Sequence, residues 1–401
     1  MAFILRALNE GGKTTGCTRR YSGVLMKNAF KSLVMGLSIA GFAAPLAGHA
    51  QTGNTLIDSK FPELSRYLNV SEVLQAAVFD EIVASNGSSD STIGKALLKE
   101  ALVELSAAEF SHYHSASDHL AMLGPFRVFE SRATPGLQAM IRSEFDQEET
   151  DNVLEANGSI PPLAVQVLKR GRDFGNKLIE IYLDDEIFDK HSAVDAALQN
   201  YLSDDAHSVA AHPKSSDLLS EHPYAYSFRV GFPQLSGLTW ASQWLQLATL
   251  ELAMKSRSQA ELENNISNVI ALYEEKIAPA HGGLMNLPTD IPTMPVIAPN
   301  LYGFHPGAAY VIDNISALKV VIGDILVNPD VPNRTQAIEE MVAKFTDKNE
   351  FLDKETDYLY FVLRGGIYNQ GGPAVGGMVE NERNRSRAAS NIQHISNYPM
   401  R

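Results

Sequence analysis

The chain has 401 residues, of which 45% are hydrophobic, and it carries a formal net charge of −14. That length can bury a large core in one domain or two. The excess of acidic residues repels phosphates and anionic lipid heads, which argues against nucleic acids and membrane surfaces as partners. The single cysteine is Cys17, so we expect no disulfide, no thiolate metal site, no c-type haem and no iron–sulfur cluster in the rest of the chain.

Residues 1–50 are expected to be a targeting leader. A short basic segment from Met26 precedes an uncharged apolar run over 32–47, and small residues follow up to Ala50. These are the three parts of a secretory signal peptide. The apolar run is too short to span a bilayer stably. We therefore expect cleavage after Ala50, no membrane insertion of the mature chain, and a periplasmic or secreted location.

The segment before Met26 leaves the export route open. Thr18-Arg19-Arg20 partly matches the start of a twin-arginine signal, but Ser22-Gly23-Val24 stands where that signal has bulky apolar residues and a lysine. We favour an ordinary secretory signal. Removing residues 1–50 leaves 27 Lys and Arg against 46 Asp and Glu, a formal charge of −19.

Apolar residues at spacings of three and four predict seven helices after the leader. In chain order they cover 64–84, 95 to about 120, 161–182, 235–254, 260–277, 310–327 and 335–345. Runs of alternating residues with hairpin signals are not found. The sequence therefore predicts an all-α, multi-helix bundle with long surface loops and little or no sheet.

Three loops are predicted, at Asn86–Ser91, His207–His222 and Ala278–His305. The last contains five prolines and is expected to wrap the surface in extended form; loops of such length are often functional. The predicted organisation is the leader, one helical domain over 51–363, and a tail rich in Gly, Asn and Arg over 364–401.

The most suggestive chemical motif is a Glu-x-x-His spacing at Glu109 and His112, with His119 returning to the same helix face two turns later. Helical bundles use this spacing to direct a carboxylate and an imidazole at one metal ion. Such donors suit iron, manganese, zinc or copper. Glu251 and Glu274 are the candidate carboxylate partners. The alternative is an amphipathic helix whose solvated side is rich in histidine.

Two further histidines bracket the proline-rich loop, His281 and His305. If that loop folds over the bundle, either imidazole reaches a site that begins at Glu109 and His112. A separate acidic run, Asp184 to Asp189, has a spacing that can hold magnesium against a diphosphate. We prefer to interpret it as a solvated turn, with the preceding helix ending before Asp184.

Trp240 and Trp244, which share a helical stripe, indicate a candidate ligand pocket. Aromatic residues at this spacing are usually core and occasionally form the wall of an apolar pocket. Arg229, just before this helix, would either orient an anionic ligand or pair with one of the many acids.

Two hypotheses for function follow from these patterns. The first is an exported helical-bundle protein that binds a metal ion, with a metal-dependent oxidoreductase as its more specific form. The second is a metal-free periplasmic module for ligand binding or protein interaction, with an apolar pocket near Trp240 and Trp244. The sequence favours binding of a metal ion or small molecule in the broad sense, and leaves catalysis undecided.

Overall fold

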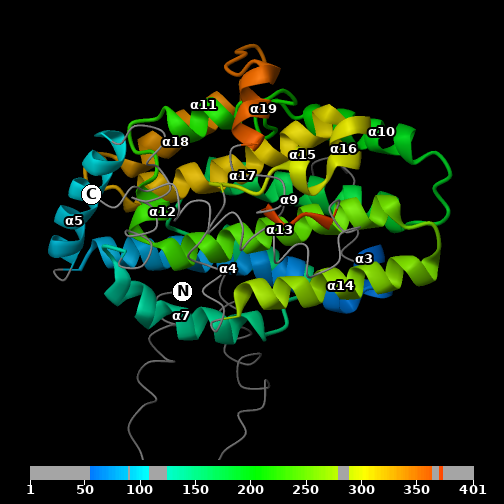
Figure 1. Ribbon diagram of the computed structural model, residues 1–401, viewed down its shortest axis with the longest axis horizontal. Helices are drawn as coiled ribbons and strands as arrows, with labels where there is room; N and C mark the ends of the chain where they lie inside the picture. The colour runs from blue at the N-terminus through cyan, green and yellow to red at the C-terminus, as the bar shows by residue number, and fades with distance from the viewer. Residues whose placement is uncertain (1–54, 89–90, 108–123, 279–288, 364–369, 374–401) are drawn as a thin grey trace, which may run out of the picture. The chain divides into compact units, whose positions relative to one another are not determined.

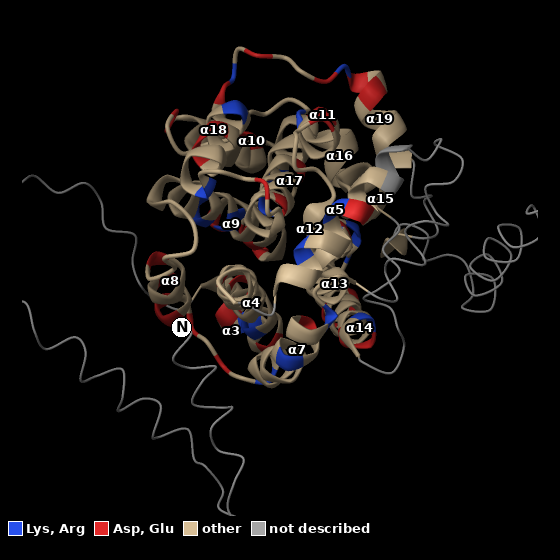
Figure 2. Ribbon diagram, turned by 90° about the vertical axis from the view of Figure 1, so that its left-hand side faces the viewer, with Lys and Arg blue, Asp and Glu red and all other residues tan. Residues whose placement is uncertain are grey.

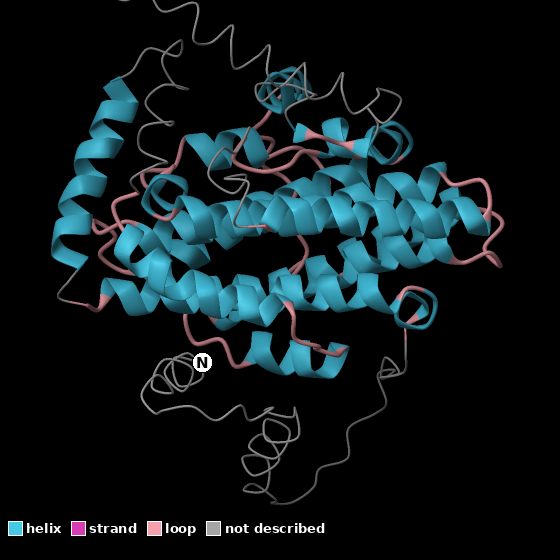
Figure 3. Cartoon of the chain, turned by 60° about the horizontal axis from the view of Figure 1, so that its bottom comes forward, coloured by secondary structure: helices cyan, strands magenta, loops and turns pink. Residues whose placement is uncertain are grey.

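The computed structural model describes residues 55–88, 91–107, 124–278, 289–363 and 370–373. Within these ranges the chain forms sixteen helices and no strand (Figures 1 and 3), so the all-α prediction is confirmed. None of these helices combines the length and the apolar character needed to cross a membrane. The expected leader and the motif of Glu109, His112 and His119 lie outside the described residues.

Seven helices correspond to those predicted from periodicity. They are α4 (Pro62–Asn86), α5 (Ser91–Ala107), α9 (Pro162–Leu183), α13 (Pro233–Lys255), α14 (Gln259–Ile277), α17 (Pro306–Val327) and α18 (Arg334–Thr346). The remaining nine within the described ranges are α3 (Leu56–Lys60), α7 (Arg127–Ile141), α8 (Gln147–Glu155), α10 (Lys190–Leu202), α11 (Ser215–Ser220), α12 (Ser227–Gly231), α15 (Met294–Ile297), α16 (Pro299–Phe304) and α19 (Glu355–Leu363).

Four long helices form the centre of the core. Helices α4 and α9 each pack against both α13 and α17. Every residue of α17 from Ala308 to Val327 is buried, because neighbouring helices cover it on all sides. Charged residues instead mark surrounding helices such as α7, α14 and α18 (Figure 2).

The charged side chains that α17 does carry are paired inside the core. Lys319 Nζ lies 2.7 Å from a carboxylate oxygen of Glu72 on α4. Asp313 accepts a hydrogen bond of 2.6 Å from the hydroxyl of Tyr358 on α19. Such partners are needed because an unpaired charge in a helical core is strongly destabilising.

Proline starts several of the helices in the same way. Phe61, Phe232, Ala298 and His305 each end a short helix, and the proline that follows each of them begins the next helix. The residue before proline is disfavoured in the α conformation, whereas proline itself is tolerated in the first turn. These X-Pro junctions allow two helices to meet at an angle without an intervening loop.

The prediction of an extended surface loop over Ala278–His305 is wrong for the part that the structure describes. Two short helices, α15 and α16, occupy most of 294–304, and Met294, Ile297 and Leu301 are fully buried. The sequence prediction took the prolines as a sign of extended chain. In the structure they lie in the first turns of these helices, and the prediction is wrong for that reason. Helix α11 likewise interrupts the predicted loop His207–His222.

Candidate metal site

Glu251, a predicted metal ligand, lies on α13 and caps another helix. Its two carboxylate oxygens accept hydrogen bonds from the backbone N–H of Asn300, at 3.0 Å, and from the Asn300 side-chain amide, at 2.5 Å. Burial raises the pKa of Glu251, although both bonds from Asn300 act in the opposite direction. The carboxylate therefore satisfies donors in the first turn of α16.

Glu274, the other predicted carboxylate partner, lies on α14 and accepts a hydrogen bond from the hydroxyl of Tyr67 on α4. Burial raises the pKa of Tyr67 to about 12, and the bond to Glu274 also raises it. This contact joins α14 to α4.

The two tryptophans of the predicted pocket are almost fully buried on α13. The ammonium of Lys276 lies 4.5 Å from the ring centroid of Trp244 and 5.8 Å from that of Trp240. A cation over an indole face is a stabilising contact within the protein itself. Arg229 forms an ion pair of 2.7 Å with Asp290.

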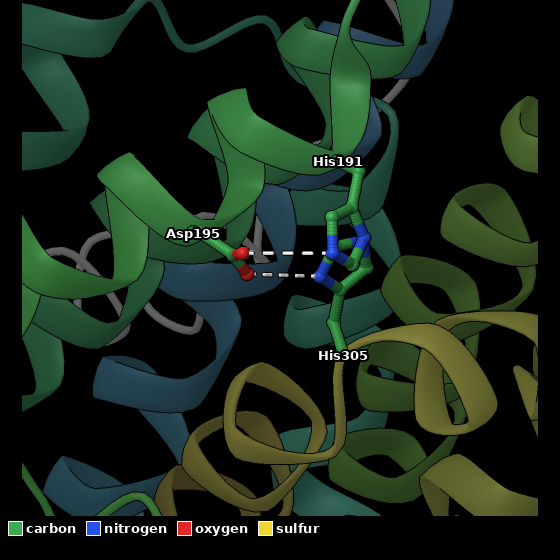
Figure 4. Close-up of side chains that lie close together, drawn as sticks. All are labelled: His191, Asp195 and His305. Carbon is green, nitrogen blue, oxygen red and sulfur yellow. Dashed lines mark hydrogen bonds and ion pairs between the residues drawn. The ribbon is translucent and has the colours of Figure 1, made fainter.

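A group with metal-ligand geometry is formed by His191, Asp195 and His305 (Figure 4). Among the described residues this is the one group of three such side chains whose potential ligand atoms all lie within 4.8 Å of one another. His191 Nε2 is 3.6 Å from one oxygen of Asp195, and His305 Nδ1 is 3.3 Å from the other. The two imidazole rings lie 4.5 Å apart between centroids.

Helix α10 supplies two of the three side chains. It begins after Asp189, whose carboxylate accepts bonds from the backbone N–H and the hydroxyl of Ser192, the usual way to cap a helix. The ammonium of Lys190 donates to the carbonyl oxygens of Ile181 and Asp184 and so fixes the start of α10 to the end of α9. Because His191 and Asp195 are four residues apart, they share one helix face.

The third side chain comes from the junction of α16 and α17. His305 precedes Pro306 and takes φ −138° and ψ 64°, while its N–H still bonds to the carbonyl of Leu301. Helix α10 lies close to this junction: a Cβ added to Gly307 would be only 3.1 Å from the side chain of Leu198 on α10. The X-Pro junction and the small Gly307 together bring His305 to α10.

The site has one buried and two solvent-exposed members. The side chain of His305 is 3% exposed, whereas those of His191 and Asp195 are 61% and 57% exposed. Burial lowers the pKa of His305, Asp195 raises it, and the neighbouring His191 lowers it; the net shift is downward. A lowered pKa favours the neutral imidazole, the form that binds metal.

Two nitrogens and a carboxylate oxygen are the donor set of open zinc sites, which have three protein ligands and leave the fourth position to water or another group. Ligand atoms of a tetrahedral zinc ion with bonds of 2.0–2.1 Å are about 3.3 Å apart. The two separations to Asp195, 3.3 and 3.6 Å, run to different oxygens of its carboxylate, and each is close to the spacing of two ligand atoms. Imidazole and carboxylate donors also suit iron, manganese and copper.

Sequence reasoning noted His305 but did not connect it with His191 or Asp195. The His-x-x-x-Asp spacing of the latter two places them on one face of a helix, but the apolar periodicity predicts no helix over 190–202. Comparison with known proteins finds no matching family model, no matching curated protein and no matching solved structure. The assignment of this site therefore rests on its own geometry.

Proposed function

We propose that this protein binds a divalent transition-metal ion, with zinc the best match, through His191, Asp195 and His305. The observation that supports the proposal is the convergence of three potential ligand atoms within 4.8 Å, although 110 residues separate Asp195 from His305. An expected export signal would place this binding outside the cytoplasm, in the periplasm or the medium.

The surrounding charge favours a cation. Asp185, Glu186 and Asp189 are exposed just before the two ligands on α10, and the whole chain is strongly acidic. A negative field raises the local concentration of divalent cations and speeds their association. Binding would also hold α10 against the junction of α16 and α17, so the metal would stabilise the fold by mass action.

The more specific form of the proposal, a metal-dependent oxidoreductase, requires a redox-active ion. Zinc has no redox chemistry of its own, whereas iron, manganese or copper at the same donors would supply it. If the protein is instead a metal-free binding module, chelation should leave its melting temperature unchanged. It would require Lys276 to move away from Trp240 and Trp244 before a ligand could reach the indoles.

The test is metal titration of the purified full chain after chelation. We expect one equivalent of zinc, and His305→Ala should weaken binding on the order of 100-fold or more, since loss of even an outer-shell partner costs about 10–100-fold. Calorimetry gives the affinity and elemental analysis gives the stoichiometry. Unchanged zinc affinity in His305→Ala would reject this site.

A matched control is His207→Ala. His207 lies 3.0 Å from the Asp204 carboxylate, which gives it the same His–Asp pairing without membership of the three-residue group, so zinc affinity should not change. A second arm is His112→Ala, which removes a ligand predicted from the Glu-x-x-His motif. Loss of metal in that variant alone would move the site to Glu109, His112 and His119.

A further inference from the structure

The chain between α18 and α19, residues 347–354, which we call the connector, lies along residues 205–217. Midway, His212 donates from Nε2 to the carbonyl oxygen of Glu350 at 3.1 Å. The ring of His212 also stacks on that of Phe351, at 4.1 Å between centroids. The connector is therefore attached to a second segment of chain on its way to α19.

The end of the connector is bonded to α11. Both carboxylate oxygens of Asp353 accept a backbone N–H of that helix, one from Ser216 at 2.9 Å and the other from Asp217 at 3.0 Å. Asp353 is only 7% exposed, so little water competes for these bonds. An acceptor of two N–H groups binds them best as an ionised carboxylate.

A second carboxyl group lies against the first. The side chains of Asp217 and Asp353 are hydrogen-bonded to each other, and two carboxylates so close cannot both ionise without strong repulsion. Because both oxygens of Asp353 already accept bonds, Asp217 is the member that carries the proton. Burial raises the pKa of Asp217 to about 6, and the carboxylates of Asp353, Glu221 and Asp357 raise it as well.

The charged groups on the other elements around this pair have partners of their own. Helix α17 packs against α11, and its three charged side chains contact residues elsewhere: Asp313 with Tyr358, Lys319 with Glu72, and Asp324 with His222. On the side of the connector, His212 faces Asp353, and burial lowers the pKa of this imidazole. Lys214 donates from Nζ to the carbonyl oxygen of Lys344.

Helix α19 covers polar side chains of the core. It lies at the edge of the bundle, against α11 and α15 (Figure 1). Glu355, in its first turn, accepts hydrogen bonds of 3.2 and 3.3 Å from the hydroxyls of Tyr302 and Tyr310. Tyr358 donates to Asp313, which is fully buried. Movement of α19 would therefore expose a carboxyl group and two phenols to solvent.

We infer that the connector and α19 form a pH-dependent lid, closed while the carboxyl groups of Asp217 and Asp353 share a proton and released when that proton passes to solvent. Loss of the proton leaves two carboxylates in contact, with Glu221 and Asp357 beside them. Like charges at this distance repel, and the repulsion acts on the end of the connector. Helix α19 then separates from α11 and uncovers Asp313. None of the three proposed metal ligands belongs to this lid.

The sign of the pH dependence follows from Asp217. The pKa of Asp217 is about 6 in the closed lid, against an ordinary value of 3.8. Between these two values the open form releases the proton while the closed form keeps it. The contribution of the pair to closure is therefore full below pH 3.8 and is lost as the pH rises through 6.

Hydrogen–deuterium exchange of the full chain, read by mass spectrometry, tests the lid. Excess chelator is present, because metal binding itself depends on pH. After correction for intrinsic exchange rates, protection of the α19 amides should fall on the order of tenfold between about pH 4.5 and about pH 7.5, a modest factor because solvent screens a partly exposed pair. Asp217→Asn keeps a donor toward Asp353 and has no proton to lose, so its protection should fall much less.

The matched control is Asp205→Asn. It removes a carboxylate that is 90% exposed and pairs with Lys348 of the connector at 3.0 Å, and it should leave the fall in protection in place. The amides of α9 report on opening of the whole fold, and they should lose less protection than those of α19.

Three results would overturn the lid: equal protection of α19 at both pH values in the parent, a fall just as large in Asp217→Asn, or an equal fall in α9. If Asp217→Asn does not fold, Glu221→Gln decides, because it removes an exposed carboxylate that faces the same pair. Its fall in protection should be smaller than that of the parent. An unchanged fall in Glu221→Gln would then reject the lid.

Discussion

At the scale of single residues, Glu251 bears a charge in an otherwise apolar stretch of α13, where an unpaired carboxylate would be very unfavourable. Asn300 resolves this by donating both its backbone N–H and its side-chain amide. The partner lies 49 residues away, directly after Pro299. Sequence could show that Glu251 needs a partner, but not that the partner is the first turn of a helix rather than a metal ion.

Glu251→Gln tests that role. The amide has one acceptor oxygen in place of two, so one Asn300 donor should lose its partner, at a cost of about 1–3 kcal/mol in the free energy of unfolding. Urea denaturation measures the loss. Metal content should be unchanged. A variant of normal stability that had lost its metal would restore Glu251 as a ligand.

The candidate site could be only half anticipated from its residues. His191 and Asp195 have a local spacing that a helix converts into proximity, which is readable without a structure. His305 reaches them only because Pro306 sets the junction and Gly307 lets α10 approach. That approach depends on tertiary packing, which no local pattern encodes.

At the scale of helices, Glu130 of α7 shows how one element completes another. Helix α13 starts at Pro233 after Phe232, which has no capping side chain. Glu130 supplies the missing acceptor, since its carboxylate takes bonds from the N–H groups of Gln234 and Leu235. Burial nevertheless raises the pKa of Glu130 to about 7, while these two bonds lower it.

This shift fixes the sign of a pH dependence. The ordinary carboxyl value is 4.5, so between pH 4.5 and 7 the unfolded chain releases this proton while the folded chain still holds it. The contribution of Glu130 to stability is therefore full below pH 4.5 and is lost as the pH rises to 7. Glu130→Gln keeps an acceptor oxygen and has no proton to lose.

We expect Glu130→Gln to match the parent near pH 4.5 and to exceed it at pH 8 by up to about 3 kcal/mol. Chemical denaturation across pH 4–8 measures the difference. Glu148→Gln, on an exposed side chain of α8, is the control and should leave the profile unchanged. A difference between Glu130→Gln and the parent that did not grow with pH would contradict this account.

Three of the helices that the sequence missed share a physical cause. Helices α12, α15 and α16 are four to six residues long, too short to show a repeat of 3.6 residues. The proline that follows Phe232, Ala298 and His305 is the sequence signal that marks where each of these helices ends. An X-Pro pair after an apolar run is thus the signal for a helix junction here, and the predicted loop at 278–305 overlooked it.

At the scale of the whole molecule, the all-α architecture could be predicted because most of the long helices have an apolar pattern of their own. Helix α17 could also be predicted from the sequence, because its apolar run is continuous. What the pattern could not show is which helices become neighbours. The Glu72–Lys319 pair, which joins α4 to α17, has partners 247 residues apart and depends on that arrangement.

The net charge of the chain has two consequences, and added salt weakens both. Self-repulsion among the acidic residues opposes the compact state, while the same negative field attracts a divalent cation. Raising the ionic strength from about 0.01 M to about 0.15 M shortens the screening length from roughly 30 Å to 8 Å. Both effects should therefore weaken. Weaker self-repulsion favours folding, and weaker attraction of the cation disfavours metal binding.

We expect sodium chloride over that range to raise the melting temperature of the metal-free chain by a few degrees, since about 1 kcal/mol corresponds to roughly 2–4 °C for a domain of 150–250 residues. The rate of zinc association, followed by stopped flow, should fall over the same range. Sucrose at constant ionic strength supplies the control, because it stabilises proteins without screening charge. After correction for its viscosity, the association rate should stay close to the low-salt value. A melting temperature that fell with added salt would mean that attractive pairs such as Glu72–Lys319 outweigh the repulsion of the acidic surface.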